Sequence, residues 1–453
     1  MDVDFDLIER YILKVVAEGR FPSISLGIVE DGVIKYLRSF GFRDVESSLP
    51  ATPETSYCLG SVTKSFTAIA VMQLYEKGLL DLQDPVGKYV DLNLKAFDEE
   101  ITIHNLLTHT SGIPALGYAE ALIDSYYGIR DVWLPITSPD DVLTFMKDYE
   151  RWVMYKPGLR WFYLNEGYVI LGKVIEKVSK ISYEEYVRKN ILSKLGMSRS
   201  YFSIADYLND GNKATPYIIT KDGLKLTKPI FGITADGGLF SNASDLSKYV
   251  LTLINRGSLN NEVILSRESL EIMEQPHVKL PYESFTSDAY GYGLTVKENF
   301  LGYKLIGHSG SVYVYTAYMG YIPSRKLGVV LLANASSKPL SLVGAYILTY
   351  LLGEDPEKLP YVVLDRLYKK LEGTYEGYMK TVELRIRRSG DTLFLVEKDK
   401  EGETLTPLIP HKIEENYALF HILTLAGKVP VEFFIKNEKD IIMIYERYKL
   451  IKR

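Results

Sequence analysis

Apolar and polar positions alternate along the first part of the chain in patterns that separate helix from strand. Residues 4–19 repeat apolar side chains at a helical period and predict a helix. Two apolar runs follow, 23–29 and 33–39, and the turn residues Glu30-Asp31-Gly32 between them predict a β-hairpin. The apolar run 66–75 is continuous and predicts a buried helix.

The same patterns continue to about residue 352. We predict helices at 167–179, 183–194 and about 339–352, and strands at 292–296, 304–308, 315–321 and 327–333. The first and last segments then supply the strands, while the middle, about 80–230, is an inserted and mainly helical region. This pattern predicts an α+β fold in which helices flank an antiparallel sheet.

The pattern changes after a polar stretch with two prolines, residues 353–360, which we interpret as a domain boundary. Short alternating runs follow within 375–396 and 431–449, separated by turn residues. They predict a small antiparallel barrel or sandwich. We therefore expect a catalytic domain at 1–353, a linker at 354–370 and an all-β domain at 371–453.

Composition excludes several classes of function. The 453 residues are 46% hydrophobic and 25% charged with a net charge of −5, and no basic cluster with interleaved aromatics is present, which argues against a nucleic-acid partner. No apolar run reaches the ~18 residues of a spanning helix, so we expect no membrane partner. The acidic start of the chain lacks a signal-peptide pattern, and we expect a cytoplasmic protein.

Cysteine and glutamine are both rare. The single Cys58 excludes an internal disulfide and a cysteine-based metal cluster, and we interpret it as a small buried side chain. Only three Gln accompany 35 Tyr, which hints at a thermophilic source.

Ser61 and Lys64 form the only Ser-x-x-Lys of the chain and stand at the start of the helix predicted at 66–75. A hydroxyl at a helix start lies near unpaired N–H groups and the positive end of the helix dipole. A lysine three residues on shares its helical face and, when buried, can accept the serine proton. The alternative is a capping serine followed by a surface lysine.

Two further segments could complete a serine site. Tyr163 and Asn165 are two apart in an extended segment, so they point to one side, where a phenol can act as a base and an amide can bind a carbonyl. The alternative is a buried tyrosine with a capping asparagine, and Tyr207-Leu208-Asn209 shows that the spacing also arises by chance. His308-Ser309-Gly310 lies between strand-like runs; Gly310 would allow close approach of substrate, and His308 could carry charge, relay a proton or be structural.

In this order the three motifs resemble those of the serine β-lactamase and penicillin-binding-protein family, which pairs Ser-x-x-Lys with Tyr-x-Asn and a Lys-Thr-Gly or His-x-Gly strand. Residues 102–112 and 235–241 also look like segments shared with class C-like relatives, and the resemblance covers roughly 10–350. The chain most resembles the branch of D-aminopeptidases and esterases, including archaeal serine peptidases. That branch often appends a lipocalin-like β domain, which 371–453 fits in size.

The resemblance implies roles for individual residues. Ser61 would be the nucleophile, with Lys64 and Tyr163 sharing its proton and Asn165 orienting Lys64 and the substrate amide. The backbone N–H groups of Ser61 and Ser311, beside Gly310, would form the oxyanion hole. No metal and no organic cofactor is implied. His109 and Asp236 lie in the shared flanking segments, and for both we favour a structural or packing role over a catalytic one.

One departure bears on the substrate. His308 stands where penicillin-hydrolysing members carry Lys, and an ordinary histidine is only partly charged at neutral pH. We therefore expect a peptidase acting on short peptides, possibly containing D-residues, or a carboxylesterase, with a pH dependence tied to His308. A catalytically silent binding or scaffold protein is the alternative from another class, and the C-terminal domain could mediate homo-oligomer formation.

Overall fold

The chain folds into two compact units. The computed structural model describes residues 4–131, 134, 136–229, 234–398, 400, 402–438 and 440–453. Unit 1 comprises Met1–Glu354 and unit 2 comprises Asp355–Arg453, and each is described by itself. Within the described residues, every helix is too short or too polar to span a bilayer.

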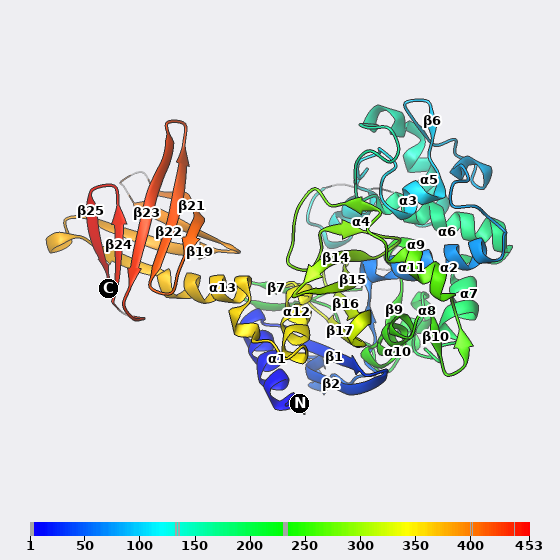
Figure 1. Ribbon diagram of the computed structural model, residues 1–453, viewed down its shortest axis with the longest axis horizontal. Helices are drawn as coiled ribbons and strands as arrows, with labels where there is room; N and C mark the ends of the chain where they lie inside the picture. The colour runs from blue at the N-terminus through cyan, green and yellow to red at the C-terminus, as the bar shows by residue number, and fades with distance from the viewer. Residues whose placement is uncertain are drawn as a thin grey trace. The chain divides into compact units, whose positions relative to one another are not determined.

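An antiparallel sheet of nine strands forms the centre of unit 1 (Figure 1). Its order is β12-β13-β14-β15-β16-β17-β1-β2-β3, so the strands from the two ends of the unit pair at β17 and β1. The strands are β1 (Ser23–Glu30), β2 (Val33–Asp44), β3 (Leu49–Pro50), β12 (Val278–Lys279), β13 (Ala289–Tyr290), β14 (Thr295–Phe300), β15 (Tyr303–Ser311), β16 (Thr316–Ile322) and β17 (Leu327–Ala333). The predicted hairpin and antiparallel sheet are confirmed.

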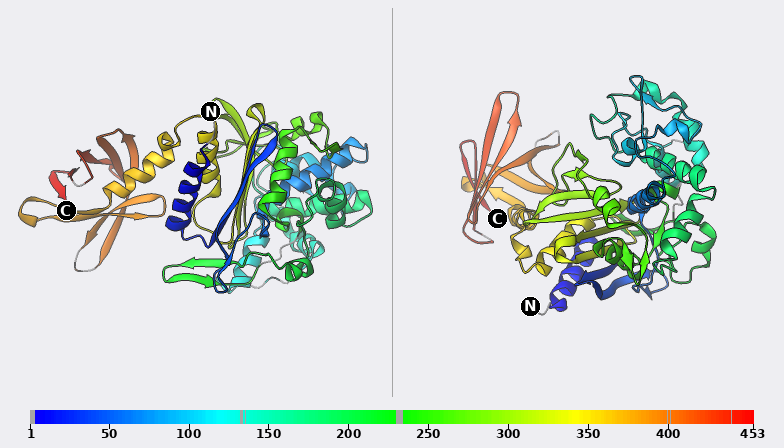
Figure 2. Two further views of the ribbon diagram at one scale, coloured as in Figure 1. Left: turned by 90° about the horizontal axis from the view of Figure 1, so that it is seen from below. Right: turned by 45° about the vertical axis from the view of Figure 1, so that its right-hand side comes forward.

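Helices cover both faces of this sheet (Figure 2). Helices α1 (Phe5–Gly19) and α12 (Leu340–Leu351) pack on one face, where Leu26 of β1 and Leu331 of β17 are buried. Helix α10 (Ala243–Ile254) packs on the other face, against Val330 and its neighbours. Alternate residues of each strand therefore enter different cores, which explains why β17 is apolar throughout and why β1 is buried along almost its whole length.

The inserted region contributes most of the remaining helices of unit 1. Helix α2 (Thr63–Glu76) is buried from Thr63 to Leu74, as the continuous apolar run predicts. The predicted helix at 167–179 is α6 (Asn165–Ser179), and the one at 183–194 is α7 (Tyr183–Val187) followed by a π-helical turn, Arg188–Leu192. The shorter helices are α3 (Ile103–Leu107), α4 (Tyr118–Tyr127), α5 (Pro139–Phe145), α8 (Ile204–Asn209), α9 (Thr234–Gly237) and α11 (Arg267–Met273).

Small two-stranded pairs connect the helices of unit 1. They are β4 (Tyr57–Cys58) with β9 (Phe240–Ser241), β5 (Lys95–Ala96) with β6 (Glu99–Glu100), β7 (Tyr217–Thr220) with β8 (Gly223–Leu226), and β10 (Ser258–Leu259) with β11 (Glu262–Val263). Cys58 is buried, as expected, and burial raises the pKa of its thiol to about 12.

Unit 2 is a closed antiparallel barrel, which confirms the predicted barrel. Its strands are β18 (Gly373–Glu376), β19 (Glu383–Ser389), β20 (Thr392–Lys398), β21 (Glu403–Ile413), β22 (Tyr417–Thr424), β23 (Gly427–Ile435), β24 (Ile441–Tyr445) and β25 (Tyr448–Lys452). The segment 354–370, expected as a linker, is instead largely helical: α13 (Pro360–Leu371) places Leu367, Tyr368 and Leu371 in the barrel core. Its apolar positions share one helical face, so this segment belongs to unit 2.

Candidate active site

Ser61 lies in a 3-10 turn, Gly60–Val62, that leads directly into α2. Strand β4 just before it pairs with β9, and the Leu59 N–H donates to the Leu239 carbonyl at 2.8 Å. Ser61 itself is half-buried. Its hydroxyl is therefore held at the start of a buried helix but stays accessible in part to solvent.

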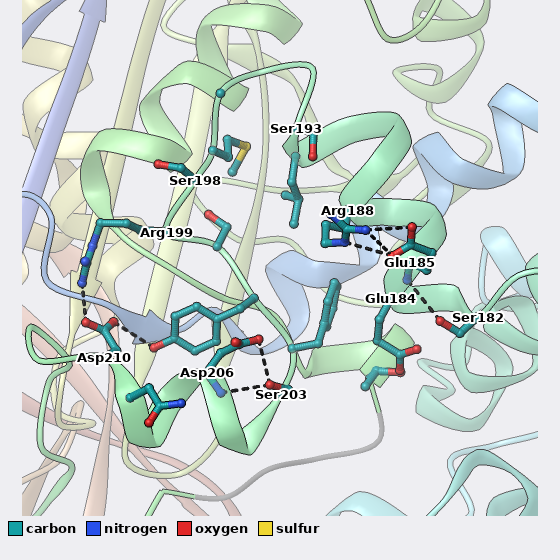
Figure 3. A pocket seen from close by; sticks show the side chains of 18 of the residues that line it. Ser182, Glu184, Glu185, Arg188, Ser193, Ser198, Arg199, Ser203, Asp206 and Asp210 are labelled. Atoms are coloured by element: carbon teal, nitrogen blue, oxygen red, sulfur yellow. Dashed lines mark hydrogen bonds and ion pairs between the residues drawn. The ribbon is translucent and has the colours of Figure 1, made fainter.

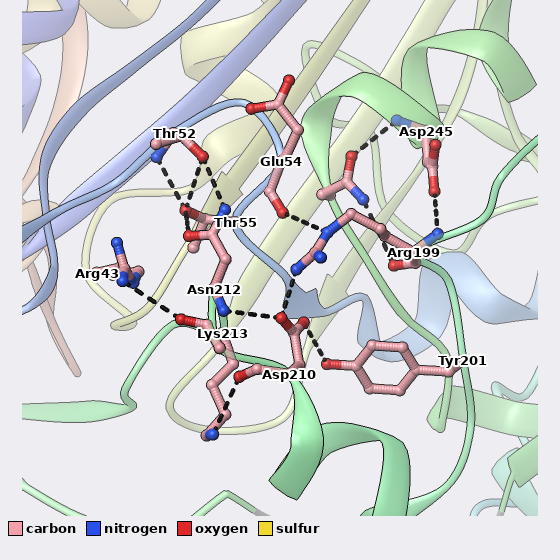
Figure 4. A network of polar contacts seen from close by, with 12 residues as sticks. Arg43, Thr52, Glu54, Thr55, Arg199, Tyr201, Asp210, Asn212, Lys213 and Asp245 are labelled. Atoms are coloured by element: carbon pink, nitrogen blue, oxygen red, sulfur yellow. Dashed lines mark hydrogen bonds and ion pairs between the residues drawn. The ribbon is translucent and has the colours of Figure 1, made fainter.

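A polar network anchors the loop that leads to β4 (Figure 4). The Arg199 guanidinium donates to the Glu54 carbonyl at 3.2 Å and to the Asp210 carboxylate. The Asn212 side-chain amide donates to the Thr52 hydroxyl at 2.9 Å. Because the contacts of Glu54 with Arg199 and of Thr52 with Asn212 join residues more than a hundred positions apart, they fix the approach to Ser61 from outside its own helix.

Lys64 is fully buried and has three hydrogen-bond partners. Its Nζ lies 3.1 Å from Ser61 Oγ, 2.8 Å from Asn165 Oδ1 and 2.8 Å from the Asp236 carbonyl oxygen. The last two atoms only accept hydrogen bonds. A neutral amine would give them both of its hydrogens, which leaves its lone pair for the Ser61 hydroxyl. The arrangement is that of a base placed to receive the serine proton.

The Tyr-x-Asn segment meets the same lysine. Asn165 is the first residue of α6, and the ring centroid of Tyr163 lies 4.9 Å from Lys64 Nζ. The structure thus brings Ser61, Lys64, Tyr163 and Asn165 together, as the motifs predict. The competing Tyr207 lies in α8, where its ring packs on Phe240 with the centroids 5.3 Å apart.

Two glycines allow the turn that carries Ser61 to approach strand β15 closely. A Cβ on Gly310 would lie 1.8 Å from the Leu59 carbonyl oxygen and 3.0 Å from Ser61 N. A Cβ on Gly60, whose φ is +52°, would lie 2.7 Å from Ser311 N. Both positions therefore require glycine. The amide nitrogens of Ser61 and Ser311 both lie where this turn and β15 meet, so they are the candidates for an oxyanion hole.

His308 lies near Lys64, in surroundings that disfavour the charge that its sequence position suggests. Its Nδ1 lies 2.6 Å from the Ser309 carbonyl oxygen and therefore donates, so Nε2, 2.9 Å from the Tyr290 hydroxyl, accepts. Burial, together with the charge of Lys64, lowers the pKa of His308 to about 4. Burial of the ring and the use of both its nitrogens therefore argue against the partly charged His308 that the sequence predicts.

A group of acidic and phenolic side chains lies on the other side of Lys64. Asp236, whose carbonyl oxygen accepts from Lys64, also accepts from the Tyr118 hydroxyl at 2.5 Å through Oδ2. Glu166 Oε1 accepts from Tyr118 N at 3.2 Å, and burial raises the pKa of Glu166 to about 7. We call Tyr118, Glu166 and Asp236 the carboxylate cluster. Sequence reasoning missed Tyr118 and Glu166, and only the position of Glu166 next to Asn165 could have indicated them.

A pocket of about 960 Å³ lies apart from these residues, between α7 and the segment 196–211 (Figure 3). None of the predicted catalytic residues lines it. Its arginines are already paired, Arg188 with Glu185 at 2.6 Å and Arg199 with Asp210. We assign no chemistry to it. In the part of the chain that the structure describes, no three His, Cys, Asp or Glu side chains are grouped so that they could hold a metal ion.

Comparison with known proteins agrees with this geometry. The family described as Beta-lactamase matches residues 8–351, and the Pab87 octamerisation domain matches 356–451. Protein flp of Staphylococcus aureus (strain COL) is 27% identical over 73% of the chain, which spans 63% of that protein's length. Penicillin-binding protein 4* of Bacillus subtilis (strain 168) is 29% identical over 90% of the chain and 85% of its own length.

Solved structures show the same similarity. The octameric penicillin-binding protein homologue from Pyrococcus abyssi is 47% identical, covers 99% of this chain and 100% of its own, and superposes with a TM-score of 0.95. A penicillin-binding protein from Bacillus halodurans is 26% identical over 75% of this chain and 99% of its own, with a TM-score of 0.61. With residues 8–351 matched by the family model and the barrel matched in unit 2, the chain belongs to the β-lactamase and penicillin-binding-protein-like family.

Proposed function

We propose that this protein is a serine hydrolase that works through an acyl-enzyme on Ser61. The observation that carries the proposal is the environment of Lys64, whose Nζ lies 3.1 Å from Ser61 Oγ while Asn165 and the Asp236 carbonyl occupy its other directions. A serine paired with a desolvated lysine at a helix start is an activated nucleophile.

The reaction begins with proton transfer from Ser61. The hydroxyl proton passes to Lys64, with Tyr163 sharing it, as Oγ attacks the substrate carbonyl carbon. Because the two proton acceptors are adjacent, they act as one coupled unit. The Ser61 and Ser311 N–H groups stabilise the tetrahedral oxyanion, where one donor is worth ~3–4 kcal/mol of barrier.

Collapse of the tetrahedral intermediate breaks the bond to the leaving amine or alcohol, which takes the stored proton. The acyl group then remains on Ser61 as an ester. Water attacks this ester while Lys64 and Tyr163 accept its proton, and the same proton returns to Ser61 Oγ when the acid is released. Every proton is accounted for by these side chains, so the steps require no external acid or base.

We propose short peptides, possibly containing D-residues, as substrates, with carboxylate esters as the alternative. The neutral ring of His308 supports this choice, since both its nitrogens are engaged and it offers no cation to a substrate carboxylate. A substrate that relies on such a cation, as a penicillin does in the Lys-Thr-Gly relatives, would bind less well. The same acyl-enzyme serves amides and esters, so the two candidates differ in the leaving group.

A fluorophosphonate probe tests the nucleophile directly. We expect the folded protein to be labelled at Ser61, Ser61→Ala to lose the label, and Ser198→Ala, an exposed serine of the separate pocket, to keep it. Turnover of p-nitroanilides of L- and D-amino acids, p-nitrophenyl esters and a chromogenic cephalosporin then separates peptidase, esterase and β-lactamase. Folded wild-type protein that remains unlabelled would favour the silent binding protein.

We also propose that unit 2 assembles the protein into a homo-octamer, as in the relative from Pyrococcus abyssi. The match to the octamerisation domain supports this, and so does an apolar row on the outside of the barrel. The row crosses four strands through directly paired residues, Tyr417, Phe434, Ile442 and Ile451. Phe434 and Ile451 are 43% and 51% exposed, and contiguous exposed apolar side chains of this kind are typical of an interface.

The row can be tested by reversing its polarity. We expect the wild-type protein to show a light-scattering mass near eight times 51.5 kDa, and Phe434→Glu/Ile451→Glu to dissociate. Leu423→Glu, an exposed apolar residue of β22 outside the row, is the matched control and should keep the wild-type mass. A monomeric wild-type protein would contradict the assembly itself, whereas an octameric double variant would contradict only the row.

A further inference from the structure

We propose that His109 is a positioning residue that fixes Tyr163 for proton exchange with Lys64. The inference rests on the proposed hydrolase and adds to it a residue outside the three motifs. His109 lies just after α3, more than fifty positions before Tyr163.

His109 binds the residues on both sides of Tyr163. Its carbonyl oxygen accepts from the Phe162 N–H at 2.8 Å, and its Nδ1 accepts from the Leu164 N–H at 3.0 Å. Its ring also lies against the Tyr163 ring, with the centroids 4.3 Å apart. One residue therefore holds the backbone before and after the phenol and contacts the phenol itself.

The backbone of His109 makes this double contact possible. Its φ is +59°, in the left-handed region that non-glycine residues rarely adopt. Such a conformation costs about 1–2 kcal/mol and persists where surrounding contacts impose it. The residues after His109 also bind the segment that leads to Tyr163. The Thr110 carbonyl accepts from Gly158 N at 2.8 Å, and the Gly112 carbonyl accepts from Met154 N at 3.0 Å.

The ring chemistry agrees with a positioning role rather than with a second base. Because Nδ1 accepts a backbone hydrogen bond, the proton of the neutral ring is on Nε2, which is buried and has no hydrogen-bond partner among the described residues. Burial lowers the pKa of His109 well below its usual value, and the charge on Lys64 and any charge on His308 act in the same direction. The other groups facing the ring are Tyr163 and three further aromatic side chains, Trp161, Tyr168 and Tyr290.

Placement of Tyr163 matters because proton transfer depends steeply on geometry. A displacement of about 1 Å at a reacting group can cost ~10²-fold in rate. Without the Nδ1 acceptor, the Leu164 N–H would be left buried and unpaired, and the turn that carries Tyr163 into α6 would have to move. A side chain that fills the same space without an acceptor cannot replace it.

Two variants separate the acceptor from the ring. His109→Phe keeps an aromatic ring but removes Nδ1, whereas His109→Asn removes the ring but keeps an oxygen near the Nδ1 position and tolerates positive φ. We expect His109→Phe to lower kcat for a p-nitrophenyl ester by roughly 10- to 100-fold with little change in KM. We expect His109→Asn to stay within about threefold of wild type.

A double-mutant cycle then tests whether His109 acts through Tyr163. In a Tyr163→Phe background, His109→Phe should cost less than about threefold more, since residues that act as one unit are not additive. Melting temperatures of all variants serve as the folding control. If His109→Phe does not fold, His109→Leu, which also lacks the acceptor and is smaller, takes its place.

The outcomes separate the inference from the proposed function. Wild-type kcat in the acceptor-free variant, failure of His109→Asn to retain activity, or an equal loss in the Tyr163→Phe background would each overturn the positioning role and leave the hydrolase intact. Wild-type protein that neither reacts with the fluorophosphonate at Ser61 nor hydrolyses any substrate would overturn the hydrolase and this inference with it.

Discussion

Lys64 and Glu166 are both buried next to Asn165, yet the structure treats them differently. Lys64 has a hydrogen-bond partner in each direction of its amine, and one of these partners is the nucleophile. Glu166 has one oxygen bonded to Tyr118 N, while its Oε2 is buried without a partner among the described residues. Both side chains are therefore buried, and they differ in how completely their polar atoms are hydrogen-bonded.

This difference assigns different tasks to the two regions. A fully hydrogen-bonded polar group can be kept in a dry site, whereas a half-bonded carboxylate is costly and tends to take up a proton. Asp236 joins the regions, because its carbonyl serves Lys64 and its carboxylate serves Tyr118. We expect Lys64 and its partners Ser61 and Asn165, here called the lysine region, to control the rate of catalysis. We expect the carboxylate cluster to control the stability of the fold.

The largest expected effect is on activity at Lys64. Lys64→Met keeps the length and apolar stem of the side chain but removes the proton acceptor, so kcat/KM should fall by about 10³-fold or more. Lys77→Met, at the exposed end of the same helix, is the matched control and should behave as wild type. A Lys64→Met variant within tenfold of wild type would show that the lysine is not the base.

The next effect is on stability at Glu166. Its pKa is raised from 4.5 to about 7 on folding, so the folded state holds the proton more tightly and stability falls as pH rises from about 4.5 to 7. Glu166→Gln keeps the oxygen that Tyr118 N needs and removes this penalty. At pH 8 the variant should be more stable by up to about 3 kcal/mol, a shift of roughly 4 °C in melting temperature.

The pH dependence of this gain is the decisive readout. Near pH 4.5 the difference between Glu166→Gln and wild type should vanish, because both carry an uncharged side chain. Glu268→Gln, an exposed carboxylate in the first turn of α11, controls for the general effect of removing a negative charge and should change little at either pH. A gain that is the same at both pH values would contradict a carboxyl group that titrates near 7.

The smallest expected effect concerns His308, which resembles Lys64 in being buried and fully hydrogen-bonded. With a pKa of about 4, only about 1% of it is charged at pH 6, so it cannot produce an acidic limb there. His308→Gln, which keeps an acceptor for the Tyr290 hydroxyl, should leave the midpoint of the kcat/KM profile between pH 5 and 8 within about 0.3 unit. A midpoint that moves by a full unit would restore the expectation of a charged His308.

Local motifs predicted much of the fold and of the lysine region. Ser61 and Lys64 are one helical turn apart, and Asn165 stands between an extended segment and a helix of clear apolar period. Local spacing is therefore sufficient to predict these residues as candidates. The apolar runs predict that the chain forms an antiparallel sheet. They do not predict the order of its strands, because that order depends on pairings across more than three hundred residues.

Tertiary contacts account for what the sequence did not reveal. The third partner of Lys64 is the backbone carbonyl of Asp236. Every residue has such a carbonyl, so the sequence cannot indicate which one Lys64 contacts. The protonation of His308 and Glu166 depends on burial by distant elements. The prolines of 354–370 predict a linker, but Leu367 and Tyr368 of this segment pack in the core of the barrel, which a local pattern does not show.

The pairing of β1 with β17 also has a consequence during protein synthesis. Ile24 lies opposite Ala333, so β1 leaves the ribosome roughly 300 residues before its partner, a wait of about 15–60 s at ordinary rates of elongation. Throughout that time a strand that is almost wholly buried in the finished fold has only β2 beside it. The nascent chain therefore exposes an unpaired strand edge, which can aggregate with other chains, for most of its translation. Its yield of folded protein in cells should depend strongly on holdase chaperones, even though the finished sheet is stable.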